Sequence, residues 1–106
     1  MYKFFLYAPR DTQVITKIID AAAKAGAGNI GNYTHCAFVT EGYGTWLPQQ
    51  GSKPVVGKVG ELSKEDEVRI EMECPKEKMQ AIFEAIRKVH PYDKFAIDAV
   101  SMEIFE

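Results

Sequence analysis

A chain of 106 residues has the size of one compact domain, and its 46% hydrophobic and 26% charged residues exclude a disordered chain. A net charge of −2 with Lys and Arg spread along the chain excludes a basic surface for nucleic acid, and no stretch approaches the roughly 20 apolar residues of a membrane span. We therefore expect a single cytoplasmic domain over residues 1–106, with no nucleic-acid or membrane partner. Its two cysteines do not form a disulfide framework.

The first elements in chain order are a strand and a helix. Residues 2–8 (YKFFLYA) are rich in aromatic and branched side chains and precede a proline, which predicts a strand covered on much of both faces. Hydrophobic residues then recur every three or four positions through residues 14–25. This period predicts an amphipathic helix that begins after Asp11 or Thr12 and ends at Gly26.

Two strands, a second helix and a last strand follow. Residues 33–40 predict a strand, and residues 67–74 (EVRIEMEC) predict the most regular one, because hydrophobic side chains alternate there with charged ones. The helical period returns through residues 79–89 and predicts a helix that ends before His90. Residues 94–105 predict the fourth strand.

The order strand-helix-strand-strand-helix-strand is typical of an α+β, ferredoxin-like fold, in which both helices cover one face of an antiparallel sheet. Residues 41–64 are too many for an ordinary hairpin connection, so we expect short extra strands around residues 45–48 (TWLP) and 55–60 (VVGKVG). The uncovered face of the sheet predicts a homo-oligomer, a dimer or a trimer. The alternative is that its aromatic residues, which we expect to include Phe5, Tyr7 and Phe105, belong to a single-chain core.

The segment 26–38 (GAGNIGNYTHCAF) carries two chemical signals. Its first six residues match the dinucleotide-binding pattern G-x-G-x-x-G, but that pattern requires a strand before the glycines and a helix after them, and here the order is reversed. His35 and Cys36 are adjacent, so on a strand they would point to opposite faces and not share a metal ion. The residues of this segment that stay candidates for binding a ligand are Gly31, Asn32 and Tyr33, because Gly and Asn tolerate backbone conformations that present N–H groups to a ligand.

A second candidate is the run His90-Pro91-Tyr92-Asp93. His90 at a helix end has the position of a general acid or base, and the alternative is a helix stop with a capping histidine. No Gly-x-Ser-x-Gly elbow occurs, and a catalytic zinc site needs three convergent ligands where the chain has two histidines. The sequence therefore names no cofactor. A divalent metal ion on His35 and His90 stays as an alternative, with Glu71 or Glu73 as a third ligand.

Several motifs in order resemble one family. The segments AGAGNIGNYTHCAF, GYGTWLPQQGSKPVVGKVGEL, EVRIEMECP and VHPYDKFAIDAV are similar to the inserted domain of the Nif-three-like proteins, which are also known as type-2 GTP cyclohydrolase I homologues. The resemblance covers nearly the whole chain. Three positions depart from the family pattern: Trp46 stands for phenylalanine, Asp93 for glutamate, and Phe95 for a proline that often follows.

The resemblance implies a stand-alone version of that insert, with a fold similar to PII-like and CutA-like domains. Those domains are typically trimeric and bind small ligands or metal ions at clefts between subunits. The halves that carry the dinuclear metal site of the larger relatives are not in this sequence, so the resemblance does not extend to that chemistry.

We expect a non-enzymatic, oligomeric ligand-binding or regulatory domain, although the sequence leaves its enzymatic status open. The alternatives are a small metal-dependent hydrolase and an assembly module for a separate dimetal-site protein. The expected cleft combines the turn before the second strand, the 42–46 segment and the end of the second helix. Its candidate residues are Gly31, Asn32, Tyr33, His35, Gly44, Thr45, Trp46, His90 and Tyr92.

Overall fold

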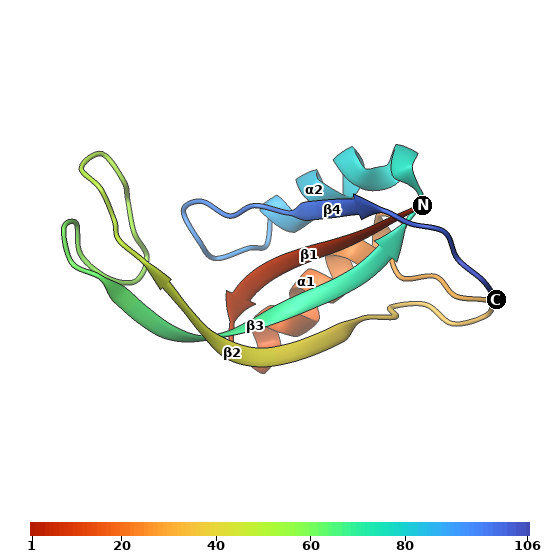
Figure 1. Cartoon of the computed structure of the whole chain (residues 1–106), viewed down its shortest axis with the longest axis horizontal. Helices are drawn as coiled ribbons and strands as arrows, with labels where there is room; N and C mark the ends of the chain where they lie inside the picture. Colours follow the sequence, from red (N-terminus) through yellow and green to blue (C-terminus); the bar gives the residue numbers. More distant parts are fainter.

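The computed structural model describes residues 1–106 and has a four-stranded antiparallel sheet with both helices on one face (Figure 1). The elements in chain order are β1 (Tyr2–Pro9), α1 (Thr12–Lys24), β2 (Phe38–Trp46), β3 (Ser63–Cys74), a single 3-10 turn η1 (Lys76–Lys78), α2 (Met79–Arg87) and β4 (Asp98–Ser101). The strand order across the sheet is β2-β3-β1-β4. This is the predicted ferredoxin-like fold.

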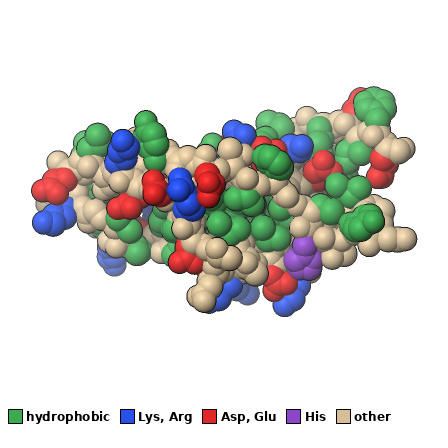
Figure 2. Space-filling model, turned by 90° about the horizontal axis from the view of Figure 1, so that it is seen from below, with side chains coloured by type: hydrophobic (Ala, Val, Ile, Leu, Met, Phe, Trp, Pro, Cys, Tyr) green, Lys and Arg blue, Asp and Glu red, His purple; other side chains and the backbone are tan.

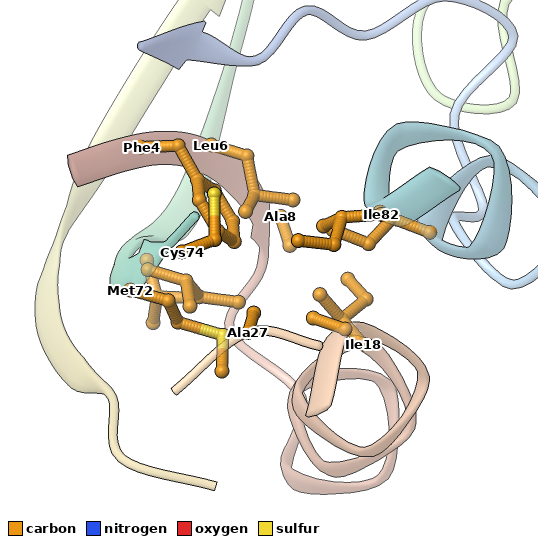
Figure 3. Close-up of a cluster of buried hydrophobic side chains, with 12 residues drawn as sticks. Phe4, Leu6, Ala8, Ile18, Ala27, Met72, Cys74 and Ile82 are labelled. Atoms are coloured by element: carbon orange, nitrogen blue, oxygen red, sulfur yellow. The ribbon is translucent and has the colours of Figure 1, made fainter. Parts of the chain in front are cut away.

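The core lies between the sheet and the two helices (Figure 3). Phe4, Leu6 and Ala8 of β1 point toward the helices, where they meet Ile18 of α1 and Ile82 of α2. The even-numbered residues of β3 extend the same layer, as the alternating pattern predicted: Val68, Ile70, Met72 and Cys74 are buried. Alternation therefore decides which face of each strand is covered.

Helix α1 begins where its sequence predicts. Asp11 is the N-cap, and its Oδ1 accepts hydrogen bonds from the backbone N–H groups of Gln13 and Val14 at 2.9 and 3.1 Å. Gly26 follows the helix with φ of +117°, a conformation that glycine adopts without strain. None of the helices combines the length and the apolar character that crossing a membrane requires.

The connection between the second and third strands differs from the prediction. The expected extra strands at 45–48 and 55–60 do not form, because β2 continues through Trp46 in unbroken register with β3 and residues 47–62 contain only turns and bends. Strands β2 and β3 thus form a two-stranded arm that extends past β1 and gives the molecule its length of 47 Å (Figure 1).

Other boundaries also need correction. The strand predicted at 33–40 begins only at Phe38, since residues before it form a turn, and β4 is confined to Asp98–Ser101. Phe5 and Tyr7 do lie on the open face, because they alternate with buried neighbours and Tyr7 is 47% exposed. Phe105 lies beyond the last strand and is 91% exposed, so it is not part of the sheet.

Candidate functional site

The candidate site lies where the arm leaves the sheet. Strand β1 pairs with β3 only as far as Pro9 opposite Glu67, whereas β2 accompanies β3 to Trp46 opposite Ser63. Glu67 is therefore at the last position of β3 that has a strand on both sides. The segment that follows α2 passes this point and brings His90 and Tyr92 to it.

His90 joins this segment to the end of β1. Strand β4 pairs with β1 only through Phe5, so the carbonyl of Tyr7 lies beyond it and accepts a hydrogen bond from Nε2 of His90 at 2.8 Å. Nδ1 of His90 accepts the backbone N–H of Tyr92 at 3.1 Å, a pattern that assigns the neutral tautomer with its proton on Nε2. Burial lowers the pKa of His90, against the weaker opposing effects of the Tyr7 carbonyl and Glu67. His90 is thus a buried anchor, stacked on Phe95 with ring centroids 4.2 Å apart.

Tyr92 and Glu67 form the polar centre of the site. The hydroxyl of Tyr92 donates to Oε2 of Glu67 at 2.6 Å, and the Tyr92 ring lies 5.9 Å from the ring of Trp46. Burial, and then the hydrogen bond to Glu67, raises the pKa of Tyr92, so the hydroxyl keeps its proton and acts as a donor. Glu67 is only 9% exposed. Its other oxygen, Oε1, has no hydrogen bond to the protein and is not fully buried, so water reaches it.

Gly44 makes room for this carboxylate. Gly44 lies diagonally across from Glu67 on β2, and a Cβ at that position would displace Oε1 of Glu67. Gly42, which lies directly opposite Glu67, has open space at the corresponding position. A side chain at 44 would therefore move the Glu67 carboxylate, and one at 42 would not.

A cavity of about 370 Å³ opens beside this cluster. Apolar and polar side chains both line it, and most come from the arm and from the segment after α2. They are Thr45, Trp46, Pro48, Ser52, Pro54, Val55, Val56, Glu67, Tyr92, Asp93 and Lys94. A second hollow of about 450 Å³ along β2 and β3 shares Glu67 with the first. Glu67 thus faces both.

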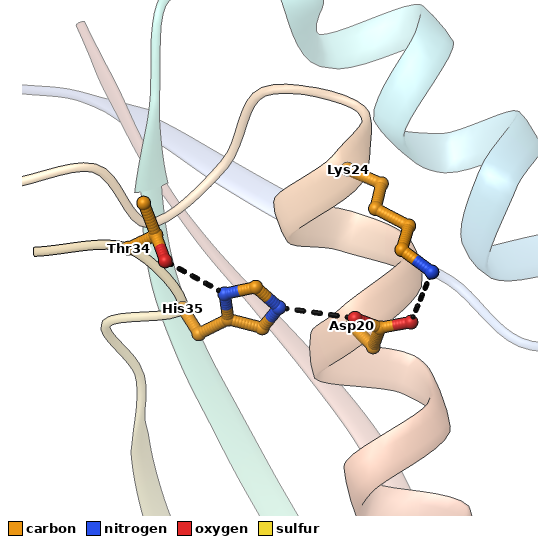
Figure 4. Close-up of polar contacts among 4 residues, drawn as sticks. All are labelled: Asp20, Lys24, Thr34 and His35. Atoms are coloured by element: carbon orange, nitrogen blue, oxygen red, sulfur yellow. Dashed lines mark hydrogen bonds and ion pairs between the residues drawn. The ribbon is translucent and has the colours of Figure 1, made fainter.

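The other predicted wall of the cleft lies elsewhere in the single chain. His35 bonds to helix α1, with Nε2 3.0 Å from Oδ1 of Asp20, and Thr34 Oγ1 lies 2.9 Å from its Nδ1 (Figure 4). The hydrogen bonds of His35 and, less strongly, of Lys24 lower the pKa of Asp20. His35 and Cys36 precede β2, so the expected division of this pair between two strand faces does not apply.

Gly31 and Asn32 form the tip of a turn whose two ends, Ile30 and Tyr33, exchange backbone hydrogen bonds of 2.9 and 3.0 Å. The Tyr33 side chain is 75% exposed. None of these residues lines the cavity. That they complete a cleft supplied by a second copy stays a prediction.

The chain does not assemble a metal site from its own side chains. His35 and His90 have different partners, and no three His, Cys, Asp or Glu side chains converge anywhere in residues 1–106. Cys74 lies in the core, where burial raises the pKa of its thiol. The chemical groups gathered at the site are therefore a carboxylate, a phenol and aromatic rings.

Comparisons with known proteins agree on one relationship. The chain is 42% identical over 101 residues to the GTP cyclohydrolase 1 type 2 homolog of Bacillus subtilis, and 33% identical over 100 residues to that of Mycobacterium leprae. A Bacillus cereus protein related to NIF3 superposes on 97% of the chain with a TM-score of 0.81 and 34% identity. This chain is homologous to a region of NIF3-family proteins. It spans about a quarter of the length of these relatives, 26% in each case.

The NIF3 relationship rests on sequence and structure, whereas a second likeness concerns the fold alone. CutA1 of Pyrococcus horikoshii superposes on the whole chain and covers 87% of its own length, with a TM-score of 0.73 but 18% identity. No protein-family model matches the chain. The NIF3-related region and CutA1 therefore share one α+β architecture.

The sequence-based candidates and the residues of the cavity overlap in part; that the cavity is a ligand site stays a prediction. Thr45, Trp46 and Tyr92 were candidates and line the cavity, whereas Gly44 lines the second hollow and His90 bonds to the backbone of Tyr92. Trp46 and Asp93, two of the three departures from the family pattern, are also in the lining. Glu67 was missed, because it alternates with hydrophobic residues in its strand, and this pattern predicts an exposed charged side chain. The available signal was Gly44 itself, because a glycine inside a strand often marks the close approach of another group.

Proposed function

We propose that this chain is a non-enzymatic, oligomeric ligand-binding module of a NIF3-family protein, and that the ligand occupies the cavity beside Glu67, Tyr92 and Trp46. The observation that supports this most is the largely buried Glu67 carboxylate, which has one hydrogen bond to the protein and a second oxygen that solvent, and therefore a ligand, can reach. Burying a charge that is only partly paired costs stability, and folding of this sheet does not require it. A ligand that completes the pairing explains why the arrangement exists.

The groups around the cavity favour binding over catalysis. They include no cysteine and no histidine, and the Tyr92 hydroxyl is held protonated by burial and by Glu67. Serine and threonine line it, but neither has a base beside it: Ser52 Oγ donates to the backbone carbonyl of Gln49 at 2.7 Å. The regulatory role predicted from the sequence stays a prediction.

The open face of the sheet supports self-association. Tyr7 of β1 and Val100 of β4 lie on the face opposite the helices, and Phe38 begins β2 on the same face, 66% exposed. Figure 2 shows the molecule at right angles to the view of Figure 1, from the edge at which β2 lies, and not the open face itself. A second copy of the chain is the partner we propose for the open face, since exposed hydrophobic patches of this kind mark interaction surfaces.

Ligand screening tests the binding proposal. Thermal unfolding of the wild-type protein and of Trp46→Ala is measured with nucleotides and with divalent metal ions. We expect a compound that raises the melting temperature of the wild type and has little effect on Trp46→Ala. Phe105→Ala, a change at an exposed site outside the sheet, is the control and should respond like the wild type. If no compound acts, or if one acts equally on Trp46→Ala, the proposed cavity is wrong.

Sedimentation tests the oligomer separately. Tyr7→Glu places a charge on the open face and should produce a smaller species than the wild type. Phe105→Glu makes a similar change away from the sheet and should leave the assembly intact. A monomeric wild-type protein at all concentrations contradicts self-association and leaves the cavity unaffected.

A further inference from the structure

The Glu67 carboxylate has an unused capacity to accept hydrogen bonds. A carboxylate offers about four acceptor positions, and the structure fills one of them with the Tyr92 hydroxyl. Its Oε1 lies against Gly44, where a side chain would displace it. Glu67 is nine-tenths buried, and it lines the cavity. Glu67 lines both this cavity and the second hollow, whose lining includes Gly44, so a donor that enters from either space can reach the carboxylate.

The other residues that line the cavity indicate which kind of molecule carries this donor. The rings of Trp46 and Tyr92 lie at 45° to each other on one side of the cavity, and prolines and valines of the arm loop line it as well. Aromatic faces attract cations as well as apolar groups. A volume of about 370 Å³ is near the lower end of the range for small-molecule sites, about 300 to 1,000 Å³. One substituted ring fits such a space.

We propose that the cavity binds a small organic cation, whose amine or amidine N–H groups donate to the Glu67 carboxylate and whose flat apolar body lies against Trp46 and Tyr92. This inference rests on the proposed ligand-binding function and names the class of ligand. The largely buried Glu67 carboxylate lines the cavity, and its negative charge disfavours anions. Asp93 and Lys94 also line it, but both are exposed, so their opposite charges are more screened by water than the charge of Glu67.

The test compares three probes of one size: benzamidine, benzyl alcohol and benzoate, which are cationic, neutral and anionic. Trp46 is the single tryptophan, so its indole N–H gives one signal in a proton–nitrogen correlation spectrum that reports on the cavity directly. We expect benzamidine to shift this signal with a Kd on the order of 1 mM, as suits a ligand of its size. Benzyl alcohol should bind at least about tenfold more weakly, because it lacks the charge-assisted hydrogen bond, and benzoate should bind more weakly still.

A matched pair of variants tests whether Glu67 is the carboxylate that binds benzamidine. Glu67→Gln should weaken benzamidine binding by about tenfold or more. Glu65→Gln makes the same change in net charge two residues away, at an exposed position on the same strand, and should bind benzamidine like the wild type. Equal binding by both variants overturns the role of Glu67.

The outcomes separate this inference from the function on which it rests. If all three probes shift the Trp46 signal with similar affinity, the cavity binds ligands but has no preference for cations, and the inference is wrong. If none shifts it at millimolar concentration, both the inference and the proposed ligand site fail. Should Glu67→Gln fold poorly, the comparison of the three probes on the wild-type protein still decides the question.

Discussion

Replacing Tyr92 with phenylalanine removes one hydroxyl and keeps the ring that packs between Trp46 and His90. The change deletes the only protein hydrogen bond of the Glu67 carboxylate, which is 9% exposed. A hydrogen bond to a charged group contributes about 1.5 to 3 kcal/mol. Because Oε1 of Glu67 is accessible to water, we expect the lower part of that range, about 1.5 to 2 kcal/mol. For a domain of this size the melting temperature should fall by about 6 to 16 °C.

Urea unfolding followed by circular dichroism measures the loss. Wild type and variant are compared at one fixed protein concentration, because self-association would make the apparent stability depend on concentration. Tyr43→Phe is the matched control: Tyr43 lies on the arm with an exposed ring and no hydrogen bond from its hydroxyl, so it should change stability by less than about 0.5 kcal/mol. A Tyr92→Phe protein as stable as Tyr43→Phe would refute the claim that the Tyr92–Glu67 contact stabilises the fold.

Three further changes have defined outcomes. Gly44→Ala should lose about 1 to 3 kcal/mol by displacing Glu67, whereas Gly42→Ala, with open space, should stay within about 0.5 kcal/mol of wild type in the same urea assay; equal effects would contradict the steric argument. Because the pKa of His90 in the folded protein lies below its ordinary value of 6.5, the unfolded chain takes up a proton first as pH falls, and stability should decline below about pH 6.5. His90→Gln, which keeps a donor, should flatten that decline in unfolding curves recorded between about pH 5 and pH 7.5, and an unchanged slope would exclude His90 as its source. Asp11→Ala should cost about 0.5 to 2 kcal/mol through loss of the helix cap, and a serine at the same position should restore most of it.

The fold could be predicted from the local sequence pattern, and the errors in that prediction have a common cause. The buried residues of β3 alternate, and those of α1 recur with the helical period, so both elements were found close to their observed places. The second strand was placed too early because Tyr33 favours extended structure. In the structure, Cys36 instead donates its N–H to the carbonyl of Gly28, and pairing with β3 begins at Phe38. Strand ends are set by a partner strand, which local pattern does not contain.

The sequence by itself determined the order of elements, the faces that are buried, and the relation to the NIF3 family, because periodicity and motif spacing are properties of neighbouring residues. Only the tertiary structure decided which candidate site residues meet. It brought Tyr92 to Glu67 across 25 positions of sequence and placed His35 beside Asp20 on α1, so within one chain the candidate residues divide between the cavity and a separate turn. The physical reason is register: where β1 stops pairing with β3, and where α2 ends, sets the position of each side chain to within a hydrogen-bond length.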